Sequence, residues 1–255
     1  METVAIVEAA RGERWVVTGL ALVVAAAWAW TLGGMDMAEA GLSVVLPAAW
    51  SPTHAALMFA MWWVMMAAMM LPSVAPVILT AAALQRRKGR SGRPELTAGL
   101  LTVGYLAVWG AFSLAATLAQ WVLEARGLIT PPGTVDGNPA VAGGISLAAG
   151  LYQLTALKQS CLWNCRSPIR FLVQHWRSGA TGAFRMGLAH GAYCLGCCWA
   201  LMALLFVGGV MHPLWIAVLT FYVLAEKLEP DGRWLSLASG LMLAVIGIVL
   251  LAPDA

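Results

Sequence analysis

Charged residues are scarce in this chain. Aspartate, glutamate, lysine and arginine make up 11% of its 255 residues, whereas soluble domains contain roughly a quarter. Hydrophobic residues make up 61%, and the mean hydropathy is +0.79. This composition argues against a water-soluble domain, and no basic stripe with interleaved aromatic residues indicates nucleic-acid binding. The sequence therefore predicts an all-α protein whose surroundings are a lipid bilayer.

Motifs of common enzyme classes are missing as well. The chain has no glycine-rich phosphate loop, so ATP-driven transport by this chain alone is not expected. It has no HExxH motif and no serine, histidine and aspartate in the arrangement of a catalytic triad. It also has no histidine pair at the spacing of a diiron or haem site. Enzymatic chemistry is therefore not the favoured interpretation, although one redox alternative stays open.

Cysteine is limited to five residues, which form two clusters. Their number is odd and they lie in or beside apolar segments, which argues against an extracellular disulfide framework. The clusters are Cys161 with Cys165, and Cys194 with Cys197 and Cys198.

Long apolar runs are what the chain has in abundance. A helix needs about 20 apolar residues to cross a membrane, and loops rich in glycine, proline and charge separate the runs. We expect residues 1–255 to form one integral membrane domain, a polytopic helical bundle of about seven spans. The predicted spans are residues 15–33, 54–84, 97–123, 139–157, 183–210, 213–228 and 234–251.

Lysine and arginine fall almost entirely on one side of this topology. With a cytoplasmic N-terminus, every basic residue except Arg126 lies on the cytoplasmic side, as the positive-inside rule requires. The sequence therefore predicts a multi-pass protein with its C-terminus outside. The basic, amphipathic stretch from Arg166 to Arg177 is expected to lie along the inner interface as a short helix.

The most informative motif is HGAYCLGCCWALM, from His190 to Met202. On a helix, His190, Cys194, Cys197 and Cys198 fall on one face. Such soft ligands suit a thiophilic metal, above all Cu(I). Each residue alone has a simpler explanation, because cysteine packs as a small hydrophobe and histidine bonds neighbouring helices. Their combination on one face favours a metal site, which would need another helix to close it.

The second span offers such a helix. The run MFAMWWVMMAAMML places Met58, Met61, Met65 and Met69 at steps of three and four residues, which form one stripe. Thioethers bind Cu(I) and reject hard cations, whereas methionine also packs irregular apolar cores. Beside a Cys/His helix, the stripe predicts Met61, Met65 and Met69 as further copper ligands.

Two smaller groups extend the pattern. Cys161 and Cys165 form a CxxxC whose thiols share a helical face, and in a reducing cytosol metal exchange is favoured over a stable disulfide. On the outer side, a set of soft donors is a candidate for the place where copper enters or leaves: Met35, Met37, His54, Met211 and His212.

Several stretches resemble a known bacterial family. WWVMMAAMMLPSVAP, GLYQLTALKQSCLWNCRSP, MGLAHGAYCLGCCWALMALLFVGGVMHPLWIA and EKLEP, between about Met58 and Pro230, are similar to a family described as predicted metal-binding integral membrane proteins, of unassigned function. The resemblance implies a polytopic fold in a bacterial inner membrane. It also implies metal binding through Cys161, Cys165, His190, Cys194, Cys197 and Cys198.

The favoured hypothesis is therefore a membrane-embedded Cu(I)-binding protein that acts in copper transport, delivery or homeostasis. Copper would move by ligand exchange among Cys, Met and His, to or from a copper-donating or copper-accepting protein or a membrane enzyme complex. One alternative is a thiol–disulfide relay that carries electrons between Cys161/Cys165 and Cys194/Cys197. The other is a structural or assembly subunit of a larger membrane complex.

Overall fold

The structure, a computed structural model, describes residues 13–39, 50–87, 93–130, 133–135, 138–229 and 233–252, with the side chains of 34–39 excepted. Its described part is almost entirely helical, which confirms the predicted all-α polytopic bundle. The helices are α2 (Arg14–Glu39), α3 (Pro52–Arg86), α4 (Pro94–Ala125), α5 (Pro139–Gln153), α6 (Ala156–Arg166), α7 (Pro168–His175), α8 (Gly179–Ala203), α9 (Leu205–Gly208), α10 (Pro213–Leu228) and α11 (Arg233–Leu251).

Local sequence signals set many of the helix starts. Five helices, α3, α4, α5, α7 and α10, begin at a proline, whose fixed φ and missing N–H suit the first helical turn. Ser51, Asn138 and Thr155 precede α3, α5 and α6, and each side chain accepts a hydrogen bond from a backbone N–H three residues later. These boundaries therefore follow from short-range chemistry.

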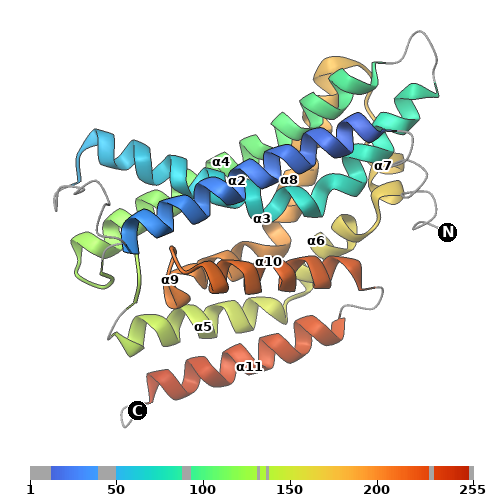
Figure 1. The fold of residues 1–255 in the computed structure, drawn as a ribbon. Helices are drawn as coiled ribbons and strands as arrows, with labels where there is room; N and C mark the ends of the chain where they lie inside the picture. Colours follow the sequence, from blue (N-terminus) through green and yellow to red (C-terminus); the bar gives the residue numbers. More distant parts are fainter. Residues whose placement is uncertain are drawn as a thin grey trace.

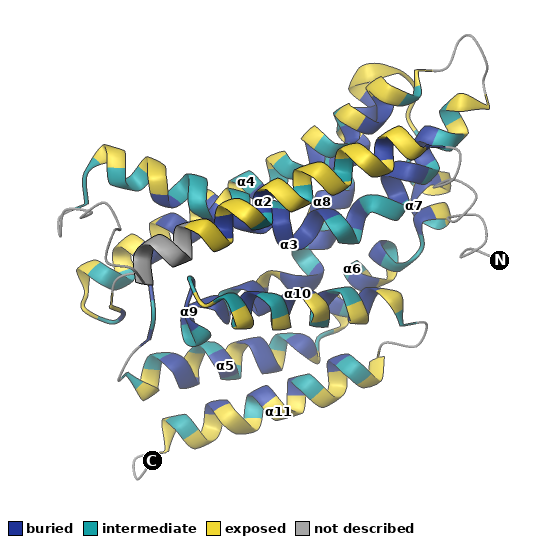
Figure 2. Ribbon diagram, in the orientation of Figure 1, coloured by how far each residue is buried: buried dark blue, intermediate teal, exposed yellow. Residues whose placement is uncertain are grey.

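The helices pack in pairs that bring distant segments together (Figure 1). α4 packs along α8, α5 along α11, and α3 against both α2 and α4. α6 also packs on α8, and α10 contacts α3, α6 and α8. Figure 1 shows the α5–α11 pair at the lower edge of the molecule, whereas helix α2 passes in front of α3 in the upper half. The central helices are consequently buried on most sides, whereas α2 and α11 expose their outer faces (Figure 2).

Glycine allows α4 and α8 to approach closely. A Cβ atom at Gly104 would lie 2.3 Å from the carbonyl oxygen of Phe184, and one at Gly187 would lie 2.2 Å from that of Leu101. Backbones can come this near only where small residues face each other. The close crossing brings Tyr105 of α4 beside Cys194 of α8, so it positions part of the candidate site.

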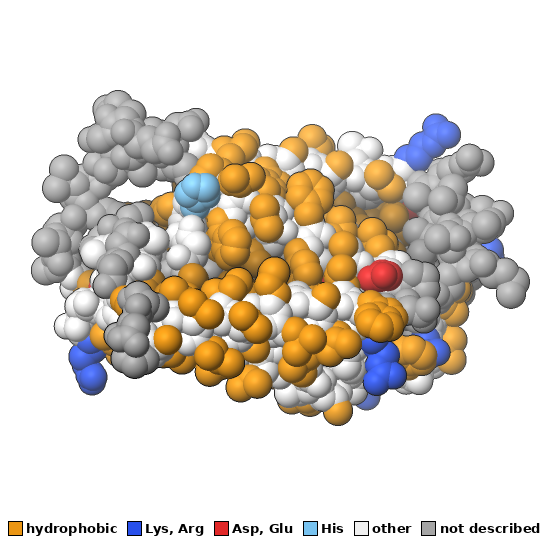
Figure 3. Space-filling model, turned by 90° about the horizontal axis from the view of Figure 1, so that it is seen from below, with side chains coloured by type: hydrophobic (Ala, Val, Ile, Leu, Met, Phe, Trp, Pro, Cys, Tyr) orange, Lys and Arg blue, Asp and Glu red, His pale blue; other side chains and the backbone are white. Residues whose placement is uncertain are grey.

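Within the described ranges, five helices are long and apolar enough to cross a bilayer. They are α2 from Arg14 to Gly33, α3, α4, α8 continued through α9 to Gly208, and α11. A sixth is reached if α5 and α6, bent by 66°, count as one span. Figure 3 shows an apolar band, with lysine and arginine side chains towards the two ends of the face. Both findings support a membrane protein.

The helices differ from the seven predicted spans in two places. The span expected at 139–157 stops at Gln153, where the chain turns into α6. The span expected at 213–228 is α10, but 16 residues make a helix of only about 24 Å, shorter than the apolar core of roughly 30 Å. The amphipathic segment expected at 166–177 contains α7, whose Phe171 and Leu172 are buried.

Candidate metal centre

Three thiols of α8 converge inside the bundle. Cys194, Cys197 and Cys198 are buried, and their Sγ atoms all lie within 4.8 Å of one another. Their spacing of three and four residues places them on adjacent positions of one helical face. Three sulfur atoms that each bind a metal at about 2.3 Å would be roughly 4 Å apart. Small side-chain rotations therefore suffice to bring these thiols onto one ion.

Helix α6 adds a fourth thiol from another part of the chain. The Cys165 side chain is buried and lies next to those of Cys194 and Cys197. Cys161, one turn earlier, is half-buried, and a Cβ atom at Gly196 would lie 2.7 Å from its Sγ. The two cysteine clusters of the sequence therefore face each other across the α6–α8 contact, and all five cysteines are free thiols.

The Cys194 sulfur has two polar neighbours from other helices. Lys227 Nζ of α10 donates to it at 3.0 Å, and the Tyr105 hydroxyl of α4 also lies 3.0 Å away. The Lys227 ammonium donates to Ser73 Oγ at 2.8 Å, and the Tyr105 hydroxyl to the Met70 carbonyl at 3.1 Å. A buried ammonium stabilises negative charge on an adjacent sulfur. Side chains of α4 and α10 thus meet at one thiol of α8, and α3 holds both of them by hydrogen bonds.

The other two thiols of α8 are oriented by the backbone of their own helix. Cys197 Sγ donates to the Cys194 carbonyl at 3.1 Å, and Cys198 Sγ donates to the same oxygen at 3.0 Å. Side chains that bond a carbonyl three or four residues earlier lie back along the helix. This geometry keeps both sulfur atoms on the Cys194 side.

His190 is buried one turn before Cys194 but is not part of the three-thiol group. Its ring meets that of Phe171 edge-on, with centroids 4.7 Å apart. Among the described residues its Nδ1 atom has no hydrogen-bond partner. Buried polar atoms are normally paired, so this nitrogen is free to accept a ligand. Its role in metal binding stays a prediction.

The methionine stripe of α3 lies in the same hydrophobic core. Met65 and Met69 are buried, and Met61 is half-buried and packed against that core. At Cys194, however, α3 contributes the carbonyl of Met70 and, through Lys227, the hydroxyl of Ser73. Whether the thioethers of Met61, Met65 and Met69 bind copper therefore stays a prediction.

The soft donors expected on the outer side have different surroundings. His212 caps α10, because its Nδ1 atom accepts the backbone N–H of Trp215 at 3.4 Å. The His54 ring packs on Trp50 with centroids 4.7 Å apart, and its Nδ1 has no partner in the described part of the chain. Met211 is half-buried against the core, whereas the side chains of Met35 and Met37 lie outside the described residues.

A buried ion pair joins α6 and α10, the helices that carry Cys165 and Lys227. Lys158 Nζ lies 2.6 Å from Glu226 Oε1 and also donates to the amide oxygen of Gln153. The Tyr222 and Ser236 hydroxyls each donate to Glu226 Oε1 at 2.8 Å. Lys158 in the first turn of α6 is thus bonded to Glu226 near the end of α10.

Lys227 and Tyr105 were not identified as site residues from the sequence. A lysine near the end of an apolar segment fits snorkelling as well as a buried role, and tyrosine in an apolar helix is common. Lys227 is nevertheless buried beside Cys194. The only available signal was its basic charge within an apolar helix.

Comparison with known proteins agrees with this chemistry. The chain matches the model of a family named PpoB2 and described as a copper chaperone, over residues 59–250. That range includes all five cysteines and the methionines from Met61 onwards. No curated protein and no solved structure matches the chain significantly. A copper-related family and a cluster of buried sulfur ligands point to the same metal.

Proposed function

The chain belongs to the PpoB2 family of copper chaperones, and from this membership we propose that it carries Cu(I) as cargo on the thiols of Cys194, Cys197 and Cys198. The convergence of three buried sulfur atoms within 4.8 Å supports the proposal most directly. Thiolate is the ligand type that selects Cu(I) over hard cations. Because the site is buried, bound copper is kept from water.

The charges around the thiols favour such a complex. Three thiolates and one Cu(I) ion together leave a net negative charge, which is costly inside a bundle unless it is compensated. The Lys227 ammonium lies 3.0 Å from Cys194 Sγ and supplies compensating charge. Cys165 lies beside the same thiols and acts as a further donor during exchange.

A chaperone must also release its cargo, and the arrangement of donors supports ligand exchange. Cys165 and Cys161 lie one turn apart on α6, with Cys161 less buried than Cys165, so they lead away from the site. On α3, Met61, Met65 and Met69 continue the chain of sulfur donors through the shared core. Copper would pass between these groups and α8, with His190 as an additional ligand.

The setting of this exchange is a bacterial inner membrane, with the N-terminus in the cytoplasm. The five apolar helices support a membrane location, and the positions of the basic residues support the orientation. The partner would be a protein or membrane enzyme complex that donates or accepts copper, as membership of a chaperone family suggests.

Metal analysis of the protein, purified without oxygen and loaded with Cu(I), tests the proposal. The wild-type protein should retain stoichiometric Cu(I) against bathocuproine, and the triple variant Cys194→Ala, Cys197→Ala, Cys198→Ala should retain none. Cys161→Ala is the matched control and should still hold copper, because Cys161 is not part of the three-thiol group.

The proposal would be wrong if the loaded wild-type protein retained no Cu(I) against bathocuproine. If two thiols of that protein were lost and regained with oxidant and reductant, the thiol–disulfide relay would explain the cysteines. If neither copper nor reversible oxidation were found, the cysteines would be packing residues of a structural or assembly subunit.

A further inference from the structure

The soft face of α8 continues beyond the thiols towards the start of the helix. Met186 precedes His190 by four residues, as His190 precedes Cys194, and all three side chains are buried. Each step of four residues advances about 6 Å along a helix. Donor groups therefore lead from the thiol site to Met186 at regular intervals.

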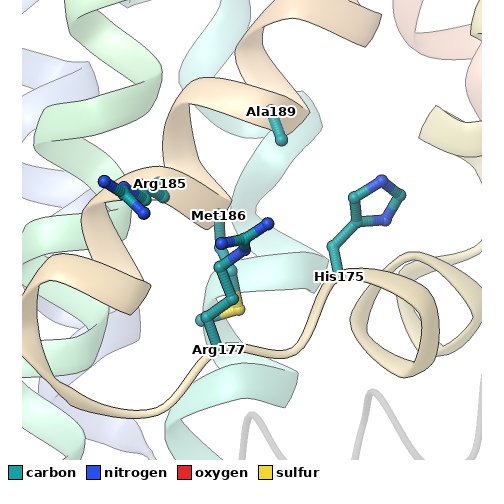
Figure 4. A pocket seen from close by; sticks show the side chains of 5 residues that line it. All are labelled: His175, Arg177, Arg185, Met186 and Ala189. Atoms are coloured by element: carbon teal, nitrogen blue, oxygen red, sulfur yellow. The ribbon is translucent and has the colours of Figure 1, made fainter.

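A pocket opens where this series of donors ends (Figure 4). It has a volume of about 210 Å³ and is lined by His175, Arg177, Arg185, Met186 and Ala189. The two arginines are exposed, whereas Met186 is buried. The pocket thus reaches from charged groups at the surface to a thioether in the interior.

Phe171 connects the pocket wall to the interior. Its ring stacks on His175 with centroids 4.7 Å apart and meets His190 edge-on at the same distance. The Tyr193 hydroxyl lies 3.5 Å from His175 Nε2. The buried Phe171 ring therefore contacts both His175 at the pocket and His190 in the interior.

We propose that this pocket is the port through which the thiol site exchanges copper with an anionic Cu(I)–thiolate complex, a proposal that rests on the copper-carrying function above. Met186 is the first protein ligand at the port. Arg177 and Arg185 attract the complex, because two guanidinium groups repel a bare cation and draw in an anion. The port therefore sets which form of copper the protein accepts.

The exchange needs no electron transfer. Copper stays Cu(I) throughout, and each Cu–S bond to the carrier that breaks is replaced by a bond to Met186 or to a cysteine of the site. The protons that leave the protein thiols are taken up by the thiolates released from the carrier. In the reverse direction the same bonds form and break in the opposite order.

Loading rates with two donors of opposite charge test the proposal. Full-length reduced protein is mixed with the anionic Cu(I)–glutathione complex or with cationic Cu(I) in acetonitrile. The double variant Arg177→Gln, Arg185→Gln should load about tenfold more slowly from the anionic donor, a typical size for electrostatic steering. Loading from the cationic donor should not slow, and the final copper content should equal that of wild type.

Arg170→Gln is the matched control. This arginine lies on α7, where its guanidinium sits 4.2 Å from the Trp163 ring, and it does not line the pocket. Its removal should leave both loading rates unchanged. The proposed port would be contradicted if the double variant and wild type loaded at equal rates from the anionic donor. It would also be contradicted if the double variant loaded equally slowly from both donors.

Met186→Leu provides a second measurement, because the two side chains have similar volume. This variant should load more slowly from both donors yet reach the same copper content, and Met242→Leu on the exposed face of α11 should behave as wild type. An unchanged loading rate for Met186→Leu would show that Met186 is not a copper ligand at the port. If wild-type protein takes up no copper at all, the proposed function fails, whereas normal copper content with unaltered rates contradicts the port alone.

Discussion

Lys227 distinguishes this thiol site from an ordinary apolar core. Its ammonium is buried, and its donors reach Cys194 Sγ at 3.0 Å and Ser73 Oγ at 2.8 Å. A bond of this kind to a charged group contributes about 1.5–3 kcal/mol. The lysine therefore has enough interaction energy with the sulfur to affect metal binding measurably.

Replacement of this lysine should weaken copper binding. We expect Lys227→Met to lower the Cu(I) affinity roughly ten- to a hundredfold, because Cys194 loses the donor that stabilises its negative charge. Competition with bathocuproine measures the change. Ser73→Ala is the control, since it removes the other partner of Lys227 and leaves the sulfur contact intact. Unchanged or tighter binding in Lys227→Met would mean that the ammonium mainly repels the metal.

Sequence spacing predicted the single face of Cys194, Cys197 and Cys198, because helical periodicity is a local property. It did not predict that Cys165 lies beside them or that Lys227 completes the surroundings of Cys194, since both depend on how helices pack. Periodicity also placed His190 on this face. The structure keeps that ring against Phe171 and outside the three-thiol group.

At the scale of elements, the buried ion pair holds α6 and α10 together. Lys158 lies in the first turn of α6 and contacts Glu226 near the end of α10 at 2.6 Å, with both side chains buried. The Arg166 guanidinium, at the other end of α6, donates to the Glu226 carbonyl at 2.8 Å. These contacts fix the helix that carries Cys165 against the helix that carries Lys227.

Loss of one partner should cost considerable stability. Lys158→Met leaves the Glu226 carboxylate buried and unpaired, and we expect the free energy of unfolding to fall by about 3–5 kcal/mol. The double variant Lys158→Met, Glu226→Gln should recover much of this loss, because no uncompensated charge remains. Thermal unfolding of the purified protein in detergent provides the measurement. The exposed Arg126→Gln variant serves as control, and a Lys158→Met protein as stable as this control would contradict the prediction.

Most helices were predictable because long apolar runs with proline and polar caps define them locally. The break between α5 and α6 was not predicted, because the local signal there is the Thr155 cap of α6, with neither proline nor glycine at positions 154 and 155. The turn there allows Lys158 to face Glu226, a long-range contact that a single apolar run does not reveal. The predicted span at 139–157 therefore extended past the true end of α5.

At the scale of the whole molecule, the described residues form five helices long enough to span a membrane, whereas the sequence predicted seven spans. In Figure 1, α10, α5 and α11 lie one below another with roughly parallel axes. α8 with α9 and α11 are both long enough to cross a membrane, and a topology of seven spans requires α10 to return the chain between them. The 16 residues of α10 would be enough for this crossing, because the helix lies among other helices rather than in lipid alone.

This path predicts that the start of α2 and the end of α11 lie on opposite sides of the membrane. By the positive-inside rule, the basic residues that border α3, α8 and α11, including Arg86, Arg177 and Arg233, predict that the start of α2 lies in the cytoplasm. Alkaline phosphatase fused after residue 252 should be active, because it folds only outside the cytoplasm, and a fusion after Arg126 should be active too. A fusion after Arg87 is the control and should be inactive, whereas a fluorescent protein at the same position should be bright.

An inactive fusion after residue 252 combined with an active one after Arg126 would mean an even number of crossings. In that case α10, or the bent pair α5 and α6, would not carry the chain across the membrane.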